Sequence, residues 1–270
     1  DWLSQSEIDK KRKKLEEDPI KWIKYFFPKY AKYEFAPFHV RAIKRVIEHD
    51  EWYEVLSWSR ELAKSTVAMF ICMYLALTKR KRFFVLASAT IDSAKRLLAP
   101  YKINFESNPR IRQFYGSQVT LGQWTDGEFT AKCGAKFVAL GAGSAPRGAR
   151  NEEVRPDVIY MDDYDTDEDC RNPETLKKKW DWFEASLYPT RSISEPTLIL
   201  WCGNIIAKDC CIKKAGAKAR HWDIVNIRDK DGHSTWPAKN TEEQIDTVLS
   251  NISTKSAQAE YFNNPVSEGT

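Results

Sequence analysis

The sequence predicts an open α/β fold in which a mainly parallel sheet is flanked by helices. Three strand-like segments are continuously apolar, at residues 83–87, 158–161 and 198–201. Strands of this kind are buried on both faces, as happens when helices cover both sides of a parallel sheet. Segments with helical periodicity alternate with them, which is the order of elements that an α/β fold requires.

Length and composition allow one large domain, or a domain with a small appendage. The chain has 270 residues, with 42 lysines and arginines against 38 aspartates and glutamates, and a net charge of +4. This mild excess permits nucleic-acid binding without requiring it. No apolar run approaches the ~20 residues of a membrane span, and the charged N-terminus lacks the apolar region of a signal peptide. We therefore expect a cytosolic protein.

Residues 1–50 are expected to form an N-terminal helical segment. Residues 3–17 have the pattern of a charged helix that is polar nearly all round. Asp18-Pro19 is a helix start, with a capping residue followed by proline at the first helical position. The helix that it opens stops before Pro28, and Pro37 opens a further helix that runs through Ile47.

Residues 51–250 are expected to form the core of the fold. Glycines between Val119 and Phe137 indicate a small antiparallel insertion at one edge of the sheet. After Asn251 the pattern weakens, and residues 251–270 are expected to begin a linker. Strands are predicted at residues 53–58, 83–88, 136–140, 157–162 and 197–202, and helices at residues 64–78, 91–105, 173–187 and 241–251.

The most informative stretch is residues 59–66, Ser-Arg-Glu-Leu-Ala-Lys-Ser-Thr, between a predicted strand and a predicted helix. Backbone N–H groups at a helix N-terminus point at an anion, a lysine adds charge, and a hydroxyl can bind Mg²⁺. The stretch therefore resembles a phosphate-binding loop, although Ala63 stands where glycine is usual. An ordinary strand–turn–helix is the alternative, but such a turn has no need of both Arg60 and Lys64.

A second group of charged residues follows about a hundred residues later. The predicted strand at residues 157–162 ends in Asp162 and Asp163, and further carboxylates follow at 165 and 167–169. In phosphate-loop ATPases one carboxylate orients a Mg²⁺-bound water and the next polarises the attacking water. The alternative is an acidic loop that caps the next helix. A neighbouring carboxylate could also take the place of Asp163.

Three shorter features complete the candidate site. A buried strand ends in Gly203-Asn204, a polar tip that could sense a terminal phosphate, although Gly-Asn is also an ordinary turn signal. Arg147 lies in a glycine-bearing loop that suits phosphate or DNA contacts, or simply solvent. The stretch from Phe35 to His39 could hold adenine, although a lone histidine is more often structural.

The order of these features resembles the ATPase domain of large terminase subunits, the DNA-packaging motors of tailed bacteriophages. That family carries a loop of the type Ser-Arg-Gln-Leu-Gly-Lys-Thr and an exit of the type Glu-Tyr-Leu-Asn-x-Pro into the next domain. The resemblance covers essentially the whole chain, including Glu260-Tyr261-Phe262-Asn263-Asn264-Pro265. It implies a P-loop NTPase of the RecA-like, ASCE class that uses ATP and Mg²⁺ to move double-stranded DNA.

The resemblance also implies a role for each candidate residue. Arg60 would act as an arginine finger in cis, Asp163 as the catalytic carboxylate, and Asn204 as part of the motif that couples hydrolysis to movement. Ser65 and Asp162 would bind Mg²⁺, and Arg147 would contact phosphate or DNA. The implied ATP-binding set is His39, in place of an adenine-reading glutamine, with Ser59, Arg60, Glu61, Leu62, Ala63, Lys64, Ser65 and Thr66.

The implied partners are double-stranded DNA, the portal protein and the terminase small subunit, in the host cell cytoplasm and without a membrane. The resemblance implies a ring, a pentamer, when assembled, with a monomer in isolation. Residues 251–270 would lead toward a nuclease domain, so no DNA cleavage is expected from this chain.

Two other functions stay open. Ser88-Ala89-Thr90 resembles a motif of superfamily-2 helicases, but there it follows the acidic strand, whereas here it precedes it. Too little chain remains for the second domain that a helicase needs. The other possibility is a degenerate loop that binds DNA or a partner without hydrolysis, which Ala63 and Asp163 would favour.

Overall fold

The structure, a computed structural model, describes residues 2–146 and 154–266, and its centre is a seven-stranded sheet with the order β3-β4-β2-β5-β6-β1-β7. Every neighbouring pair is parallel except β3 and β4, which are antiparallel. The strands are β1 (Trp52–Trp58), β2 (Phe83–Ser88), β3 (Glu128–Thr130), β4 (Lys136–Gly141), β5 (Val158–Asp162), β6 (Leu198–Cys202) and β7 (His221–Val225).

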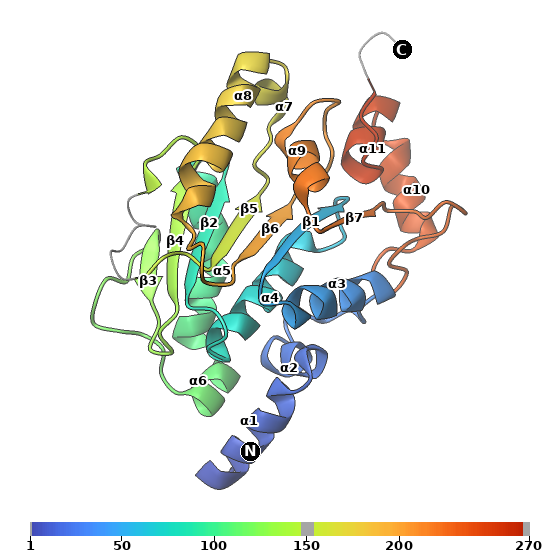
Figure 1. Cartoon of the computed structure of the whole chain (residues 1–270). Helices are drawn as coiled ribbons and strands as arrows, with labels where there is room; N and C mark the ends of the chain where they lie inside the picture. The colour runs from blue at the N-terminus through green and yellow to red at the C-terminus, as the bar shows by residue number, and fades with distance from the viewer. Residues whose placement is uncertain (1, 147–153, 267–270) are drawn as a thin grey trace.

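Helices cover both faces of this sheet (Figure 1). None of those in residues 2–146 and 154–266 combines the length and hydrophobicity that a membrane span requires. The helices are α1 (Gln5–Glu16), α2 (Pro19–Phe26), α3 (Pro37–Glu48), α4 (Lys64–Leu77), α5 (Ile91–Ser107), α6 (Pro109–Tyr115), α7 (Asp167–Cys170), α8 (Pro173–Asp181), the π-helical turn η2 (Trp182–Leu187), the 3₁₀ turn η3 (Tyr188–Thr190), α9 (Cys211–Lys218), α10 (Glu242–Ser250) and α11 (Thr254–Tyr261).

Alternate residues of the central strands point into two separate apolar cores. On β2, Phe84 and Leu86 join the core that contains α4 and α5, whereas Phe83, Val85 and Ala87 join the core that contains α8 and α9. Every residue of β2 is buried. Because each face of the strand meets helices, the sequence shows a continuous apolar run there, and the predicted α/β fold is confirmed.

The predicted strands and long helices are present, with one difference in detail. The helix predicted at residues 173–187 changes its hydrogen bonding at Trp182, where α8 passes into the π-helical turn η2. The antiparallel insertion consists of β3 beside β4, with a bridge between Trp124 and Phe129. Strand β7 was not predicted, because it is a half-buried edge strand without a continuous apolar run.

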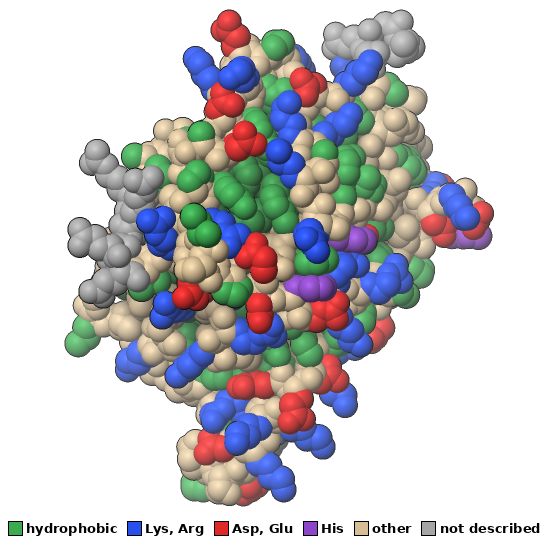
Figure 2. Space-filling model, viewed as in Figure 1, with side chains coloured by type: hydrophobic (Ala, Val, Ile, Leu, Met, Phe, Trp, Pro, Cys, Tyr) green, Lys and Arg blue, Asp and Glu red, His purple; other side chains and the backbone are tan. Residues whose placement is uncertain are grey.

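The charged N-terminal helix α1 is anchored to the rest of the molecule by its second half. Lysine, arginine and acidic side chains alternate over α1 at the lower end of Figure 2, and Ile8 is its buried residue. The Arg12 guanidinium donates to the Phe114 carbonyl on α6, and the Tyr74 hydroxyl on α4 donates to the Glu16 carbonyl. These contacts to α4 and α6 hold a helix that buries little apolar surface.

The carboxyl ends of β2, β5, β6 and β1 meet at one edge of the sheet. Asp162, at the end of β5, pairs in register with Cys202, at the end of β6, and Cys202 pairs with Leu56 near the end of β1. The segments that follow these strands therefore come together at this edge. Ligands of open parallel sheets bind in this position.

Candidate active site

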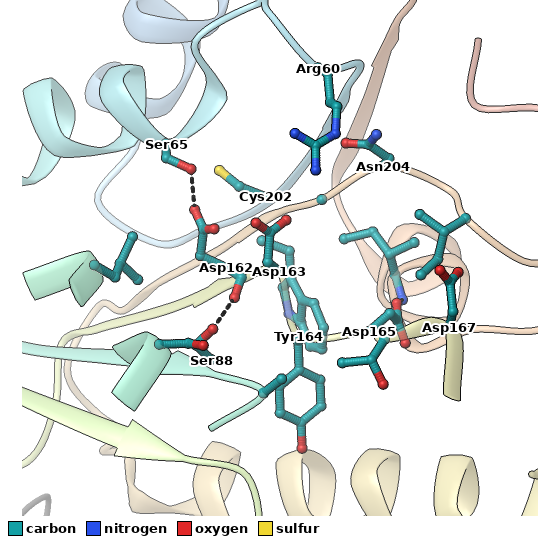
Figure 3. Close-up of a pocket in the computed structure, with 18 of the residues that line it drawn as sticks. Arg60, Ser65, Ser88, Asp162, Asp163, Tyr164, Asp165, Asp167, Cys202 and Asn204 are labelled. Carbon is teal, nitrogen blue, oxygen red and sulfur yellow. Dashed lines mark hydrogen bonds between the residues drawn. The ribbon is translucent and has the colours of Figure 1, made fainter. Parts of the chain in front are cut away.

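A cleft of about 630 Å³ lies at the carboxyl edge of the sheet (Figure 3). Its walls come from the carboxyl ends of β2, β5 and β6, from the loop and helix that follow β1, from α5, from the acidic segment after β5 and from α11. The polar and charged residues around it are Arg60, Ser65, Ser88, Ser93, Arg96, Asp162, Asp163, Asp165, Thr166, Asp167, Asn204 and Glu260. The cleft is thus lined by two residues of the loop, Arg60 and Ser65, and by carboxylates that the sequence singled out.

The candidate phosphate loop, residues 59–66, passes from β1 to α4 through two residues in the left-handed region. Glu61 has a φ of 71° and Ala63 a φ of 64°, and Ala63 is the N-cap of α4. Among the described residues no side chain caps this helix, so its first N–H groups are left to face an anion, as an anion site requires. Ala63 therefore adopts the conformation for which glycine is usual, and the loop forms without the glycine.

Substitutions at Ala63 test this conformation. We expect Ala63→Gly to keep the loop, because glycine populates positive φ readily. We expect Ala63→Val to lower the free energy of unfolding by about 1–3 kcal/mol, because a β-branched residue is strongly disfavoured there. Urea unfolding of both variants measures the difference. Equal midpoints for the two would show that the loop does not hold a left-handed residue at this position.

The Ser65 hydroxyl and the Asp162 carboxylate lie in direct contact. Ser65 Oγ, on the first turn of α4, donates a hydrogen bond to Asp162 Oδ2 over 2.7 Å. The Tyr160 hydroxyl donates to the same oxygen, and Ser88 Oγ donates to the Asp162 carbonyl over 2.8 Å. Asp162 is 4% exposed. Two groups 97 residues apart in the sequence, both expected to bind Mg²⁺, are therefore adjacent.

The charge on Asp162 is poorly compensated within the protein. Burial and the nearby Asp163 raise its pKa to about 6, against hydrogen bonds from Tyr160 and Ser65 and the charge of Lys64. A buried carboxylate beside a second one favours a bound cation. Mg²⁺ fits these donors, because it takes one or two carboxylates and completes its shell with substrate phosphates and water.

Two carboxylates after β5, Asp163 and Asp167, are exposed and line the cleft. Asp163 directly follows Asp162, its φ is 44°, and its N–H donates to the Cys202 carbonyl over 3.1 Å, which turns the chain sharply. Asp165 instead accepts from the first two N–H groups of α9, over 2.8 and 2.9 Å. Asp169 pairs with Lys179 over 2.9 Å. Two of the alternative carboxylates thus have structural partners.

His39 lies beneath the phosphate loop, fully buried. Its Nδ1 accepts the Ala36 N–H over 3.0 Å, so its Nε2 carries the proton and donates to the Leu62 carbonyl over 2.9 Å. The ring packs against Trp58 and Trp236. Because both nitrogens are engaged by backbone groups, His39 supports the loop in this structure and offers no free edge to adenine.

The burial of His39 makes stability depend on pH. Burial lowers its pKa to about 4, with the Leu62 hydrogen bond opposing the shift. Between pH 7 and pH 5 the unfolded chain gains a proton at this residue, with a pKa near 6.5, and the folded chain does not. The free energy of unfolding therefore decreases as the pH is lowered from 7 to 5, by about 2 kcal/mol.

Urea unfolding of the wild type and of His39→Gln, at pH 7 and at pH 5, isolates this contribution. The variant lacks the titrating group, so it should lose less stability on acidification, whatever its stability at pH 7. Equal losses in the two proteins would mean that His39 is protonated in the folded state.

Arg60 and Asn204 both contact Glu260, a residue of α11 that was not predicted to belong to the site. Arg60 Nε donates to Glu260 Oε2 over 2.7 Å, and Asn204 Nδ2 donates to the Glu260 carbonyl over 2.8 Å. The sequence did hold a signal for Glu260. It is the first residue of Glu-Tyr-Phe-Asn-Asn-Pro, a stretch interpreted only as an exit from the domain.

The remaining expected residues fall into three groups. Ser59 and Leu62 are buried within the loop. Lys64 and Thr66 are partly exposed on the first turn of α4. Arg147 lies outside the described residues.

A second cleft, of about 430 Å³, adjoins the loop at Glu61. Lys239 forms an ion pair with the Glu61 carboxylate, and Asn240 Nδ2 donates to the Glu61 carbonyl over 3.2 Å. Aromatic and apolar walls with a few amide groups suit a planar base. The other residues around this cleft are Tyr33, Ile227, Gln244, Ile245, Val248, Leu249 and Tyr261.

The sequence matches no protein-family model and no curated protein, whereas the fold matches solved structures. The large terminase of bacteriophage HK97 aligns over 85% of this chain and 50% of its own, with a TM-score of 0.58 and 11% identity. The ATPase domain of the large terminase of Thermus phage P74-26 aligns over 83% of this chain and 92% of its own, with a TM-score of 0.51 and 14% identity.

The chain thus spans half the length of the HK97 protein and nearly all of the P74-26 domain. At these identities the likeness concerns the fold. That fold is the one that the resemblance of the sequence implied. The described chain has the fold of the ATPase domains of bacteriophage large terminases.

Proposed function

We propose that this chain is the ATPase motor domain of a viral terminase large subunit, which hydrolyses Mg-ATP to translocate double-stranded DNA into a procapsid. The observation that carries the proposal is the 2.7 Å contact between Ser65 Oγ and Asp162 Oδ2 at the start of α4. Phosphate-loop ATPases hold Mg²⁺ with a hydroxyl and a carboxylate of this kind. The likeness to large-terminase ATPase domains supports the proposal.

We assign the following roles to the residues of the cleft. Lys64 and the first N–H groups of α4 bind the β- and γ-phosphates. Ser65 and Asp162 would hold Mg²⁺, which would supply positive charge to the transferring phosphoryl group. Arg60 adds positive charge where negative charge develops in the transition state. Asp163, exposed in the cleft, orients the attacking water and receives its proton.

We place the adenine base in the second cleft, beside Glu61. The support for this position is that the cleft adjoins the phosphate loop and has the rings of Tyr33 and Tyr261 in its walls. His39, which was expected to contact adenine, uses both ring nitrogens to hold backbone groups. Its proposed effect on ATP binding is therefore indirect, through the shape of the loop.

Filling the second cleft tests the position of the base. Val248 is 44% exposed at this cleft, so Val248→Trp fills it without disturbing the core. A stacked base contributes about 1–3 kcal/mol. We therefore expect the variant to bind ATP about tenfold more weakly than the wild type, or weaker still. Binding of inorganic triphosphate, which has no base, should not change. Val119→Trp, at a valine 38% exposed outside this cleft, is the matched control.

Unchanged ATP binding by Val248→Trp would remove the base from this cleft. Weaker binding of both ATP and triphosphate would point to a damaged loop. The measurement is fluorescence competition against a labelled ATP analogue.

The partners belong to the same proposal. A motor of this kind acts as a ring, a pentamer, on the portal protein, together with the small subunit, in the host cytoplasm. Its DNA contacts are mostly to phosphates, so binding should weaken steeply with salt. We propose residues 1–50 as the N-terminal helical segment, 51–250 as the ATPase core and 251–270 as the start of a connection toward a nuclease domain. Nuclease activity of this chain is not proposed.

The experiment that tests the function is Mg-ATP turnover by this chain, with and without double-stranded DNA, with Lys64→Ala as the blank. Turnover above the blank establishes an ATPase, and stimulation by DNA favours the motor. Nucleotide binding without turnover, both in isolation and on assembled portal, would favour the degenerate binding module. Unwinding of a DNA duplex would favour the helicase.

A further inference from the structure

Glu260 joins three parts of the molecule at the edge of the cleft. Its carbonyl accepts the Arg60 N–H over 3.1 Å and the Asn204 Nδ2 over 2.8 Å. Its carboxylate accepts Arg60 Nε over 2.7 Å and lies 3.5 Å from Asn204 Nδ2. One residue of α11 thus contacts the arginine of the phosphate loop and the polar tip of β6.

The position of Glu260 is fixed by the residues that follow it. Asn263 is 9% exposed, accepts the Ile205 N–H over 2.8 Å and donates to the Ser57 carbonyl over 2.8 Å. The Tyr261 carbonyl accepts the Ile227 N–H over 3.0 Å. These bonds attach the end of α11 to the segments at the carboxyl ends of β1, β6 and β7, so Glu260 moves with the site.

The geometry of the ion pair orients the arginine toward the cleft. Figure 3 shows the Arg60 side chain directed from the loop into the cleft beside Asn204. Because the Glu260 carboxylate accepts the hydrogen bond from Nε, the two terminal amino groups of the guanidinium can still donate to an anion in the cleft. The Arg60 side chain is 64% exposed, so without this bond it would sample many rotamers.

We propose that Glu260 is a positioning residue for ATP hydrolysis, which orients the Arg60 guanidinium and the Asn204 amide toward the terminal phosphate. This inference rests on the proposed ATPase function. With this role for Glu260, the orientation of the Arg60 side chain depends on the position of α11. Displacement of this helix breaks the ion pair and releases the arginine from its orientation toward the cleft.

The carboxylate is placed for orientation and contributes little to stability. Exposed ion pairs contribute about 0–1 kcal/mol, and Glu260 and Arg60 are 34% and 64% exposed. Replacing the side chain leaves the bonds to the Glu260 carbonyl in place. Glu260→Ala should therefore unfold at nearly the same urea concentration as the wild type, which separates a catalytic effect from a folding defect.

The test is steady-state ATP hydrolysis by Glu260→Ala, Glu260→Gln, Arg60→Ala and the double variant. A misplaced catalytic group costs up to about 100-fold, so we expect Glu260→Ala to lower kcat about 10- to 100-fold with KM nearly unchanged. Glu260→Gln should recover part of the rate, because its amide oxygen accepts from Nε. Glu260→Ala should have no further effect on Arg60→Ala, because the carboxylate acts through that arginine, whereas the Asn204 amide stays bonded to the Glu260 carbonyl in the variant.

Glu243→Ala, at an exposed carboxylate on α10, is the matched control and should keep the wild-type rate. A separate readout is the NMR signal of the Arg60 Nε–H, assigned by its absence from Arg60→Ala. This signal should shift in Glu260→Ala and not in Glu243→Ala.

Three results would overturn the inference. An unchanged or raised kcat in Glu260→Ala would mean that the carboxylate does not position the arginine productively. Additive losses in the double variant would mean that it acts elsewhere. An Arg60 signal insensitive to Glu260→Ala would mean that the pair is not formed. Absence of wild-type turnover above the Lys64→Ala blank would instead remove the proposed ATPase function, and the positioning role with it.

Discussion

Arg60→Ala is expected to lower kcat for ATP by about 10³- to 10⁵-fold, the contribution of an arginine finger in phosphate-loop enzymes, with little change in nucleotide affinity. The reason is that the negative charge opposite Arg60 develops in the transition state and not when the nucleotide binds. In the proposed site, the loop backbone and Lys64 would bind the terminal phosphoryl group in the ground state. The Arg60 guanidinium would stabilise charge that grows only in the transition state.

Single-turnover kinetics and equilibrium binding of a labelled ATP analogue measure the two effects separately. Arg41→Ala, at an exposed arginine on α3, controls for the loss of one positive charge. A parallel fall in affinity and turnover in Arg60→Ala would make Arg60 a binding residue. A loss below tenfold would exclude a role in the chemical step.

Asp162→Asn is expected to lower Mg-ATP turnover by about 10³-fold or more, because a divalent cation contributes several kcal/mol of charge stabilisation. The amide keeps the volume of the carboxylate and removes the charge that would hold the cation in the proposed site. The same change should raise the free energy of unfolding in the absence of Mg²⁺ at pH 7. Burial and Asp163 raise the pKa of Asp162 to about 6, so its ionised form destabilises the fold at that pH.

Turnover, the Mg²⁺ dependence of nucleotide binding and urea unfolding measure these effects. Asp231→Asn, at an exposed aspartate in the turn after β7, is the control. An active Asp162→Asn would place the cation on another carboxylate. A protein that loses both activity and stability would show that Asp162 holds the fold together through Tyr160 and Ser65, and the metal assignment would then rest on Ser65→Ala.

The sequence predicted the sheet and singled out the two residues of the central contact of the site for identifiable physical reasons. Strands β2, β5 and β6 are buried on both faces, so their apolar runs are uninterrupted. Ser65 and Asp162 follow directly from this, because one begins a helix after a parallel strand and the other ends a parallel strand of the same sheet. The arrangement of strands and helix alone therefore brings these two residues near each other, and their side chains meet at 2.7 Å.

The parts that the sequence did not predict depend on contacts between distant or weakly patterned segments. Glu260 lies 200 residues from Arg60 on a helix with no buried residue, so no apolar periodicity marked it. Asp165 was left as a possible catalytic carboxylate because α9, the helix that it caps, was not predicted. The buried position of His39 beneath the loop likewise required the packing of two tryptophans around it.

The attachment at Asn263 has a mechanical consequence. Its side chain holds the backbone next to β1 and β6, at the end of the helix that carries Glu260. Tension on the polypeptide after this residue would load these hydrogen bonds, and α11 would come free from the strand ends once the bonds to the Tyr261 and Glu260 carbonyls had also broken. Tension on the chain after Asn263 would thus change the contact between Glu260 and Arg60 of the loop, through a short movement of α11 and without any deformation of the sheet.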